Sequence, residues 1–192
     1  MNNLERIKLK DNGAFQEFID EMGLLISVAT DEREILSKGR MHLTKLISTD
    51  SWLPDECAES YVDRYAQHLL YKDPLDKFSV VSFVWGPGQR TPIHDHTVWG
   101  LVGVLRGAEF CTEYELDAGG KVRAQDRSHI LKKGKVEAVS PTIGDWHRVA
   151  NHLEDQPSIS IHVYGGDIGK IKRHMLNESG EMVDFVSGYS TT

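Results

Sequence analysis

The chain of 192 residues is long enough to bury one substantial hydrophobic core, and its apolar and charged fractions (40% and 27%) are ordinary for a globular domain. Its formal charge of −7 argues against a surface that binds nucleic acid or an anionic membrane. No run of about 18 apolar residues is present, so we expect no membrane span and no signal peptide. Two cysteines, Cys57 and Cys111, make no disulfide framework, and we expect a cytoplasmic protein.

The N-terminal part, to about residue 76, is predicted to be helical. Apolar residues at positions 15, 18, 19, 22 and 25 follow the period of a helix. A second helix is expected to open at Thr30, where two acids follow in the first turn. A third is expected to begin near Pro54, to end before residue 73, and to carry Tyr61, Tyr65 and Leu69 inward.

From about residue 77 the chain is predicted to form β-strands, because β-branched and aromatic residues alternate with turn residues. Strands are expected near 78–85, 98–105, 108–116, 121–132, 135–139, 146–153 and 157–164, with a last hairpin around 178–181. Many short strands with regular turns indicate a sandwich or small barrel. We therefore predict a single domain, residues 1–192, with a mainly β fold: a small antiparallel β-barrel preceded by an N-terminal helical segment.

Two histidines, His94 and His96, lie one residue apart between Gly88 and Gly107, the expected turns at the two ends of this stretch. A strand is expected to carry both of them, so that the two imidazoles point to one face, roughly 7 Å apart along the chain, and Asp95 between them points the other way. A third histidine, His147, follows its own turn. These three residues are the candidate metal ligands, although a single His-x-His motif is more often an ordinary polar feature.

A second constellation lies on the expected strand at 157–164. Ser160, His162 and Tyr164 are each two residues apart, so all three face the same side of a strand. A chain of hydroxyl, imidazole and phenol would orient the tyrosine and could pass a proton. An alternating half-exposed strand explains the same pattern without any function.

The spacing of glycines and histidines from Gly88 to Gly107 resembles the first cupin motif, and Gly134 to Asn151 resembles the second. Cupins usually carry a glutamate ligand where this chain has Gly100. Three neutral imidazoles leave a divalent metal with its full charge and an open face, which favours an anion such as a thiolate. Iron(II) can bind substrate and oxygen side by side there, whereas zinc fits the same ligands without redox chemistry.

The joint occurrence of these features resembles the cysteine dioxygenase family of thiol dioxygenases over roughly residues 60 to 175. The residues that carry the resemblance are His94-Asp95-His96-Thr97, His147, Ser160-x-His162-x-Tyr164, Tyr65-Ala66-Gln67-His68 and Val84-Trp85-Gly86-Pro87-Gly88. The resemblance implies a cupin barrel with mononuclear non-haem iron(II), Fe(2+), which adds both atoms of O2 to a small thiol to give a sulfinic acid.

The resemblance also implies the role of each matching residue. His94, His96 and His147 correspond to the iron ligands. Tyr164 corresponds to the catalytic tyrosine, which His162 and Ser160 orient. The implied partners are a small-molecule thiol and O2, with no nucleic acid and no membrane.

Two positions depart from the mammalian cysteine enzymes of this family. Gln67 stands where those have an arginine that pairs with the substrate carboxylate, and Gly100 stands where those have a cysteine cross-linked to the tyrosine. We therefore expect no thioether cross-link. The glutamine form resembles the bacterial group that prefers 3-mercaptopropionate, in which an arginine nine residues beyond the tyrosine serves the carboxylate. That position is Arg173 here, Arg90 is the competing candidate, and L-cysteine is the second choice of substrate.

Two other classes of function fit the same barrel. One is a non-catalytic cupin that binds a small ligand, which has little need of an oriented phenol. The other is a metal-dependent isomerase or hydrolase, which the sequence disfavours because no obvious carboxylate base accompanies the three histidines.

Overall fold

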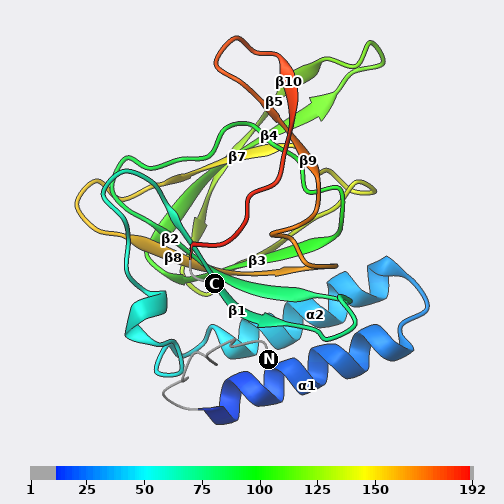
Figure 1. Cartoon of the computed structure of the whole chain (residues 1–192), viewed down its shortest axis with the longest axis vertical. Coiled ribbons are helices and arrows are strands. Elements are labelled where there is room, and N and C mark those ends of the chain that lie inside the picture. The colour runs from blue at the N-terminus through cyan, green and yellow to red at the C-terminus, as the bar shows by residue number, and fades with distance from the viewer. Residues whose placement is uncertain (1–11, 191–192) are drawn as a thin grey trace, which may run out of the picture.

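The computed structural model describes residues 12–190, in which two helices are followed by ten strands (Figure 1). The helices are α1 (Asn12–Val28) and α2 (Glu32–Leu46), and a short 3-10 helix, η1, spans Asp55–Cys57. The strands are β1 (Ala66–Lys72), β2 (Ser79–Trp85), β3 (Gly100–Arg106), β4 (Ala108–Leu116), β5 (Val122–Lys132), β6 (Val136–Val139), β7 (His147–Asn151), β8 (Ser158–Tyr164), β9 (Arg173–Leu176) and β10 (Met182–Phe185). No helix in this described part is both long and apolar enough to cross a membrane.

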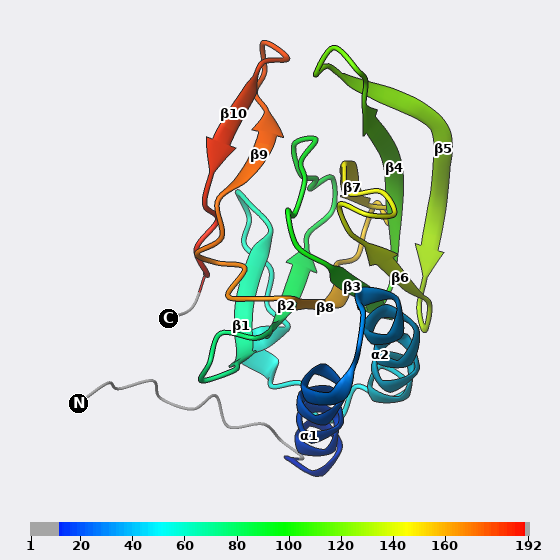
Figure 2. The same ribbon diagram turned by 90° about the vertical axis from the view of Figure 1, so that its right-hand side faces the viewer.

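Both N-terminal helices form where the sequence predicts them. In α1, the five predicted apolar positions are all buried: Phe15, Phe18, Ile19, Met22 and Leu25. Helix α2 begins two residues after Thr30, because the Asp31 carboxylate accepts a hydrogen bond from the Glu34 N–H and so caps the first turn. The two helices lie side by side beneath one face of the larger sheet (Figure 2).

The predicted third helix is wrong. After η1 the chain forms strand β1, which pairs with β2 in antiparallel register, with Gln67 opposite Phe83 and Leu69 opposite Val81. An interval of four residues fits the helix period, but it is also a multiple of the strand period of two. Tyr65 and Leu69 do pack inward as predicted, but they do so from an extended chain. Pairing with β2 decided between the two conformations.

The strands form two larger sheets and a hairpin, all antiparallel. Five strands pair in the order β1-β2-β8-β3-β6, three pair in the order β5-β4-β7, and β9 pairs with β10. The predicted strands from 78–85 to 157–164 and the hairpin near residue 180 are thus confirmed, apart from a shift of the ends by a few residues. The β9–β10 hairpin and the β4–β5 pair both rise on the side of the five-stranded sheet that faces away from the helices, one near β1 and the other near β6 (Figure 2).

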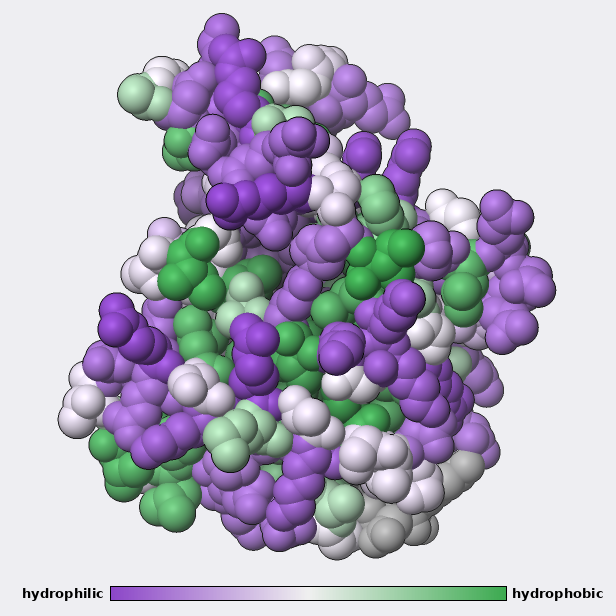
Figure 3. All heavy atoms as spheres, turned by 180° about the vertical axis from the view of Figure 1, so that it is seen from behind, coloured by the Kyte–Doolittle hydropathy of each residue, from purple (hydrophilic) through white to green (hydrophobic). Residues whose placement is uncertain are grey.

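The five-stranded sheet is covered on both faces, which explains why every residue of β2 and β8 is buried. On one face, Val80, Ile161 and Val163 pack against the helices. On the other, Phe83 and Tyr164 pack with Val149 of the three-stranded sheet. This confirms the prediction of a mainly β fold, with a small barrel of antiparallel strands after an N-terminal helical segment. Seen from behind, the projecting hairpin tips are largely hydrophilic, and apolar side chains gather lower on this face (Figure 3).

Leu43 anchors α2 to the sheet and is fully buried. We expect Leu43→Ala to lower the free energy of unfolding by about 3 kcal/mol, because it leaves a cavity between helix and sheet. Urea denaturation measures this change. The matched control is Met41→Ala on the same helix, whose side chain is 71% exposed and which should change stability by less than about 0.5 kcal/mol. Equal effects of the two substitutions would contradict this account of the helix–sheet contact.

Candidate metal centre

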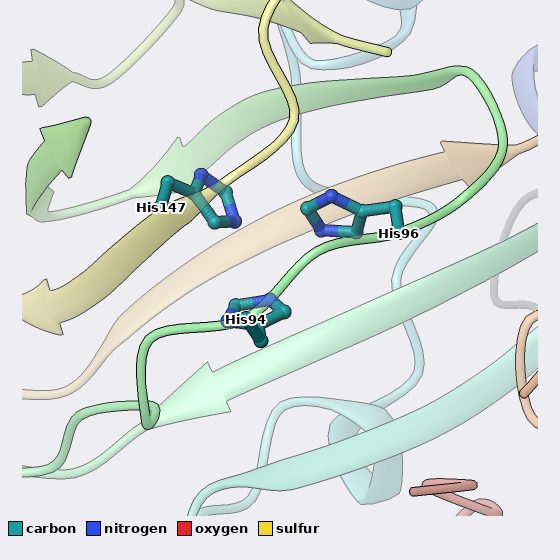
Figure 4. A group of neighbouring side chains, drawn as sticks. All are labelled: His94, His96 and His147. Atoms are coloured by element: carbon teal, nitrogen blue, oxygen red, sulfur yellow. The ribbon is translucent and has the colours of Figure 1, made fainter. Parts of the chain in front are cut away.

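The side chains of His94, His96 and His147 converge on one point inside the barrel (Figure 4). Their ring centroids are 4.8 to 4.9 Å apart, and one ligand nitrogen of each lies within 4.8 Å of the others. All three residues are buried. The structure therefore brings together the three residues that the sequence singles out.

The strand predicted to carry His94 and His96 does not form; this segment is irregular. Its shape is fixed by a reciprocal pair of backbone hydrogen bonds, from His94 N–H to His147 O and from His147 N–H to His94 O, both 3.0 Å long. Thr97 then turns the chain with φ 60°, in the left-handed region. The two imidazoles face one point because of this path and not because of strand alternation.

Asp95 points away from the two imidazoles, as the sequence predicts. Its N–H donates to His174 O (3.0 Å), its Oδ1 accepts from His174 N–H (2.7 Å), and its Oδ2 bonds the His174 ring (2.7 Å). Leu176 N–H donates to Ile93 O in the same ladder. The segment with the two histidines is therefore tied to the β9–β10 hairpin.

Each candidate ligand has a partner at Nδ1, which leaves Nε2 for a metal. His96 Nδ1 bonds Asp145 Oδ1 (2.8 Å), and His94 Nδ1 bonds Pro92 O (3.1 Å). His147 Nδ1 lies 3.7 Å from Cys111 Sγ. Within the described residues, His96 Nε2 is a buried nitrogen without a hydrogen-bond partner, as a nitrogen that binds a metal would be.

The electrostatics of the site suit neutral imidazoles. Burial lowers the pKa of His94 and His147 well below the ordinary value, and the imidazole of His96 adds to the effect in both. Burial alone would raise the pKa of Asp145, but hydrogen bonds from the His96 ring and from two backbone N–H groups hold it below its usual value. A carboxylate therefore stays ionised behind His96 and fixes its tautomer.

Ser160, His162 and Tyr164 form a continuous hydrogen-bonded chain on β8, here called the tyrosine chain. Ser160 Oγ lies 2.8 Å from His162 Nε2, and His162 Nδ1 lies 2.7 Å from Tyr164 Oη. Burial lowers the pKa of His162 well below its ordinary value and raises that of Tyr164, so the imidazole is neutral and the phenol keeps its proton. The Tyr164 ring stacks on the His96 ring with centroids 5.4 Å apart.

A cavity of about 160 Å³ opens beside the three histidines. Among the described residues its lining includes His94, His147, Gln67 and Tyr164, together with Arg173, whose side chain is the one cation in this lining. Arg90 is exposed and lines a different surface hollow. Of the two arginines left open by the sequence, Arg173 thus faces the histidines.

Arg173 is buried and is held in place by residues of the C-terminal segment. Its Nη2 donates to Ser187 Oγ (2.6 Å), and its guanidinium lies 4.5 Å from the centre of the Phe185 ring. Its Nε is buried without a hydrogen-bond partner in the described part of the chain. Burial lowers its pKa, but the group remains a cation at neutral pH. An oriented, incompletely paired guanidinium is a suitable receptor for a carboxylate.

Gly100 lies directly opposite Tyr164 in the β3–β8 register. A Cβ atom at this position would lie 2.9 Å from two carbons of the Tyr164 ring and 3.0 Å from Val139. Any side chain here, including the usual glutamate ligand of cupins, would push the tyrosine from its place. Gly100 therefore allows the close approach of the backbone to the phenol.

Several residues of the site were missed in the sequence. Asp145 lies two residues before His147 and could have been considered as the partner of a ligand. Cys111, Phe185 and Ser187 carry no such signal, because only the register of the strands and the path of the C-terminal segment bring them to the site. Both cysteines are buried and unpaired, but Cys111 is in contact with a candidate ligand.

Comparison with known proteins finds cysteine dioxygenases among the curated relatives. The curated relatives include cysteine dioxygenase type 1 of Danio rerio, 30% identical over 107 residues (53% of this chain and 51% of that protein), and of Homo sapiens, 27% identical over 106 residues (53% and 50%). The chain thus spans about half the length of the curated relatives it matches.

Among solved structures, a protein of Thermus thermophilus gives a TM-score of 0.45 at 16% identity over 58% of this chain and 92% of that one. A cupin superfamily protein of Desulfitobacterium hafniense gives 0.43 at 15% identity over 57% and 84%. The family model for cysteine dioxygenase type I matches residues 55–176, which include both segments with the candidate ligands and the tyrosine chain. The chain belongs to the cysteine dioxygenase type I family.

Proposed function

We propose that this protein is an iron(II)-dependent thiol dioxygenase that converts a small carboxylate-bearing thiol to its sulfinic acid. The observation that carries the proposal is that three histidines converge on one point, and that two of them, His94 and His147, border one small cavity together with the hydrogen-bonded Tyr164 and the buried Arg173. Membership of the cysteine dioxygenase family supports the same reaction class.

The residues present fit a divalent metal. His94, His96 and His147 offer three nitrogens with their outer ring atoms already engaged, and the buried Nε2 of His96 has no protein partner among the described residues. Iron(II) held there would supply open positions for a thiolate and O2 and the redox chemistry that joins them. The ligand set contains no carboxylate, since Gly100 stands at the glutamate position.

The other groups of the cavity bind and orient the thiol. Arg173 would hold the substrate carboxylate, with the Gln67 amide as a neutral neighbour. Tyr164, whose phenol stays protonated, would donate a hydrogen bond toward the reacting sulfur and oxygen atoms. Phe83, Trp85 and Val149 line the wall and exclude water from the reacting groups.

We propose 3-mercaptopropionate as the preferred substrate and L-cysteine as the second. Both carry a carboxylate for Arg173, but only cysteine brings an α-ammonium group into the cavity. No Asp or Glu is found among the described residues that line it, so this cation would be desolvated without a charged partner. A thiol without the ammonium group avoids that cost.

The central test is oxygen uptake by protein loaded with iron(II), with 3-mercaptopropionate, L-cysteine and cysteamine compared. We expect one O2 consumed per 3-mercaptopropionate and a product heavier by two oxygen atoms, with L-cysteine slower. His94→Ala should lose both iron and uptake, because it removes one of three ligands. Bound iron without uptake for any thiol would contradict the proposal and favour ligand binding or a different reaction on the same barrel.

Arg173→Met should raise KM for 3-mercaptopropionate about 100-fold, because the carboxylate loses a charge-assisted hydrogen bond. The KM for cysteamine, which has no carboxylate, should hardly change. Arg90→Met is the comparison variant, since Arg90 is exposed and lies outside the cavity. If Arg90→Met raises KM for 3-mercaptopropionate and Arg173→Met does not, the assignment of the two arginines is reversed.

Asp145→Asn should weaken iron binding about 10- to 100-fold, because the amide cannot hold His96 in the required tautomer as strongly as a carboxylate does. Equilibrium titration with iron(II) under anaerobic conditions measures the affinity. Asp184→Asn, a change of an exposed carboxylate on β10, is the control and should leave the affinity as it is. An unchanged affinity in Asp145→Asn would show that this carboxylate does not act on the metal site.

A further inference from the structure

Glu109 is a buried carboxyl group that the function proposed above does not use. It lies on β4 with 1% of its surface exposed, and β4 contacts β8 across the barrel. Within the described part of the chain, neither of its oxygens has a hydrogen-bond partner of normal geometry. A buried carboxyl group without an obvious partner is costly to keep, which calls for an account of what it does.

The neighbours of Glu109 connect it to the tyrosine chain. Glu109 lies opposite Asn151 in the β4–β7 register, and the Asn151 amide donates to Trp85 O (3.0 Å). The Ser160 hydroxyl and the Trp85 indole N–H are also the two side-chain groups that lower the pKa of Glu109 against the effect of burial. The Trp85 N–H also donates to Ser160 Oγ at 3.3 Å. Glu109 therefore stands at the far end of the chain from the Tyr164 hydroxyl, beyond Ser160.

The tyrosine chain has two possible donor directions, because a neutral His162 carries only one ring proton. With the proton on Nδ1, His162 donates to Tyr164 Oη, and the phenol O–H is free to donate into the cavity. With the proton on Nε2, His162 donates to Ser160 and accepts the O–H of Tyr164. In that second arrangement the phenol presents only a lone pair to the cavity.

The protonation state of Glu109 determines which of the two donor directions is favoured. A protonated Glu109 donates to Ser160 Oγ, so the Ser160 O–H turns to His162 Nε2 and the proton of the imidazole stays on Nδ1. An ionised Glu109 attracts the Ser160 O–H instead, and Ser160 Oγ then accepts from His162 Nε2. In each arrangement Ser160 and His162 both donate to an acceptor in the chain, so a change at one end reverses the whole chain.

We propose that Glu109 is a positioning residue that, in its protonated form, makes Tyr164 a hydrogen-bond donor toward the substrate site. Glu109 acts through Ser160 and His162 and touches neither the substrate nor the metal ligands. The inference rests on the proposed thiol dioxygenase function for its catalytic meaning, but the direction of the chain is a property of the protein without metal.

Burial raises the pKa of Glu109 to about 7, from an ordinary value of 4.5, and the carboxylate of Glu137 on β6 adds to the effect. The other titratable groups with which it interacts are Cys111 on its own strand and Tyr164 on β8, both neutral at this pH. Because folding raises this pKa, the stability that Glu109 contributes is complete below about 4.5 and is lost as the pH rises through about 7. The reversal of the chain is thus expected near neutral pH.

The first test uses metal-free protein and the isosteric variant Glu109→Gln. Nitrogen NMR of the His162 ring should show the proton on Nδ1 below a pH of about 7 and on Nε2 above it, whereas in Glu109→Gln the tautomer should not change with pH. Infrared difference spectra should show a protonated carboxylic acid lost over the same range, absent in Glu109→Gln and retained in Glu137→Gln, the matched control. A His162 tautomer that is the same at all pH values in the wild type would overturn the inference.

The second test asks for the catalytic consequence in iron-loaded protein. The kcat for 3-mercaptopropionate should fall on the alkaline side of about 7 in the wild type, while Glu109→Gln should lose that limb of the profile. Glu109→Met should lower kcat about tenfold with KM and iron content unchanged, because Ser160 loses its partner. Identical pH profiles in wild type and Glu109→Gln would overturn the proposed role. If no thiol is oxidised by any variant, the proposed function fails, and the NMR and infrared measurements still decide the direction of the chain.

Discussion

The reciprocal hydrogen bonds between the backbones of His94 and His147 are the constraint on which the rest of the site depends. They bring together two segments that are far apart in the sequence and lie at the edge of regular structure. With this bridge in place, the Nδ1 partners only have to set the tautomer of each ring: a carbonyl for His94, a carboxylate for His96 and a thiol for His147. The main chain therefore sets the positions of the rings, and the Nδ1 partner of each ring sets its tautomer.

Side chains alternate between the two faces of the five-stranded sheet, so one face packs against the helices and the other carries the residues of the site. On β8, Ile161 and Val163 face the helices, and His162 and Tyr164 face the cavity. The helical layer and the opposite sheet pack against β8 from both sides, so the side chains of Ser160, His162 and Tyr164 have little freedom to change rotamer. A helical layer that takes no part in the chemistry thus contributes to the order of the site.

Much of the fold was readable from local patterns. Local sequence predicts three of the elements: the helix period predicts α1, the acids in its first turn predict the start of α2, and the β-branched run predicts β2. The prediction of a third helix was wrong because Tyr61, Tyr65 and Leu69 recur every four residues, an interval that fits both the helix period and the strand period. The pairing of β1 with β2, which decides the conformation, cannot be predicted from the residues of that segment alone.

The candidate site also contains residues that the sequence predicts and residues that it does not. His94, His96 and His147, with the tyrosine chain, could be found because these residue types occur at characteristic spacings. Cys111, Glu109 and the contacts of Arg173 with Ser187 and Phe185 depend on strand register and on the path of the C-terminal segment. These residues could not be predicted from the sequence, because no local pattern marks them and only the folded chain brings them to the site.

The ladder between Asp95 and His174 has a consequence for the selection of ligands. It fastens the segment with the imidazoles to the hairpin that carries Arg173, so the two ends of the cavity are joined by several hydrogen bonds. A molecule that bridges them, with sulfur at one end and a carboxylate at the other, must match a fixed span. Under the function proposed above, a thiol one methylene shorter or longer than 3-mercaptopropionate would lose either its contact with the metal or its contact with Arg173.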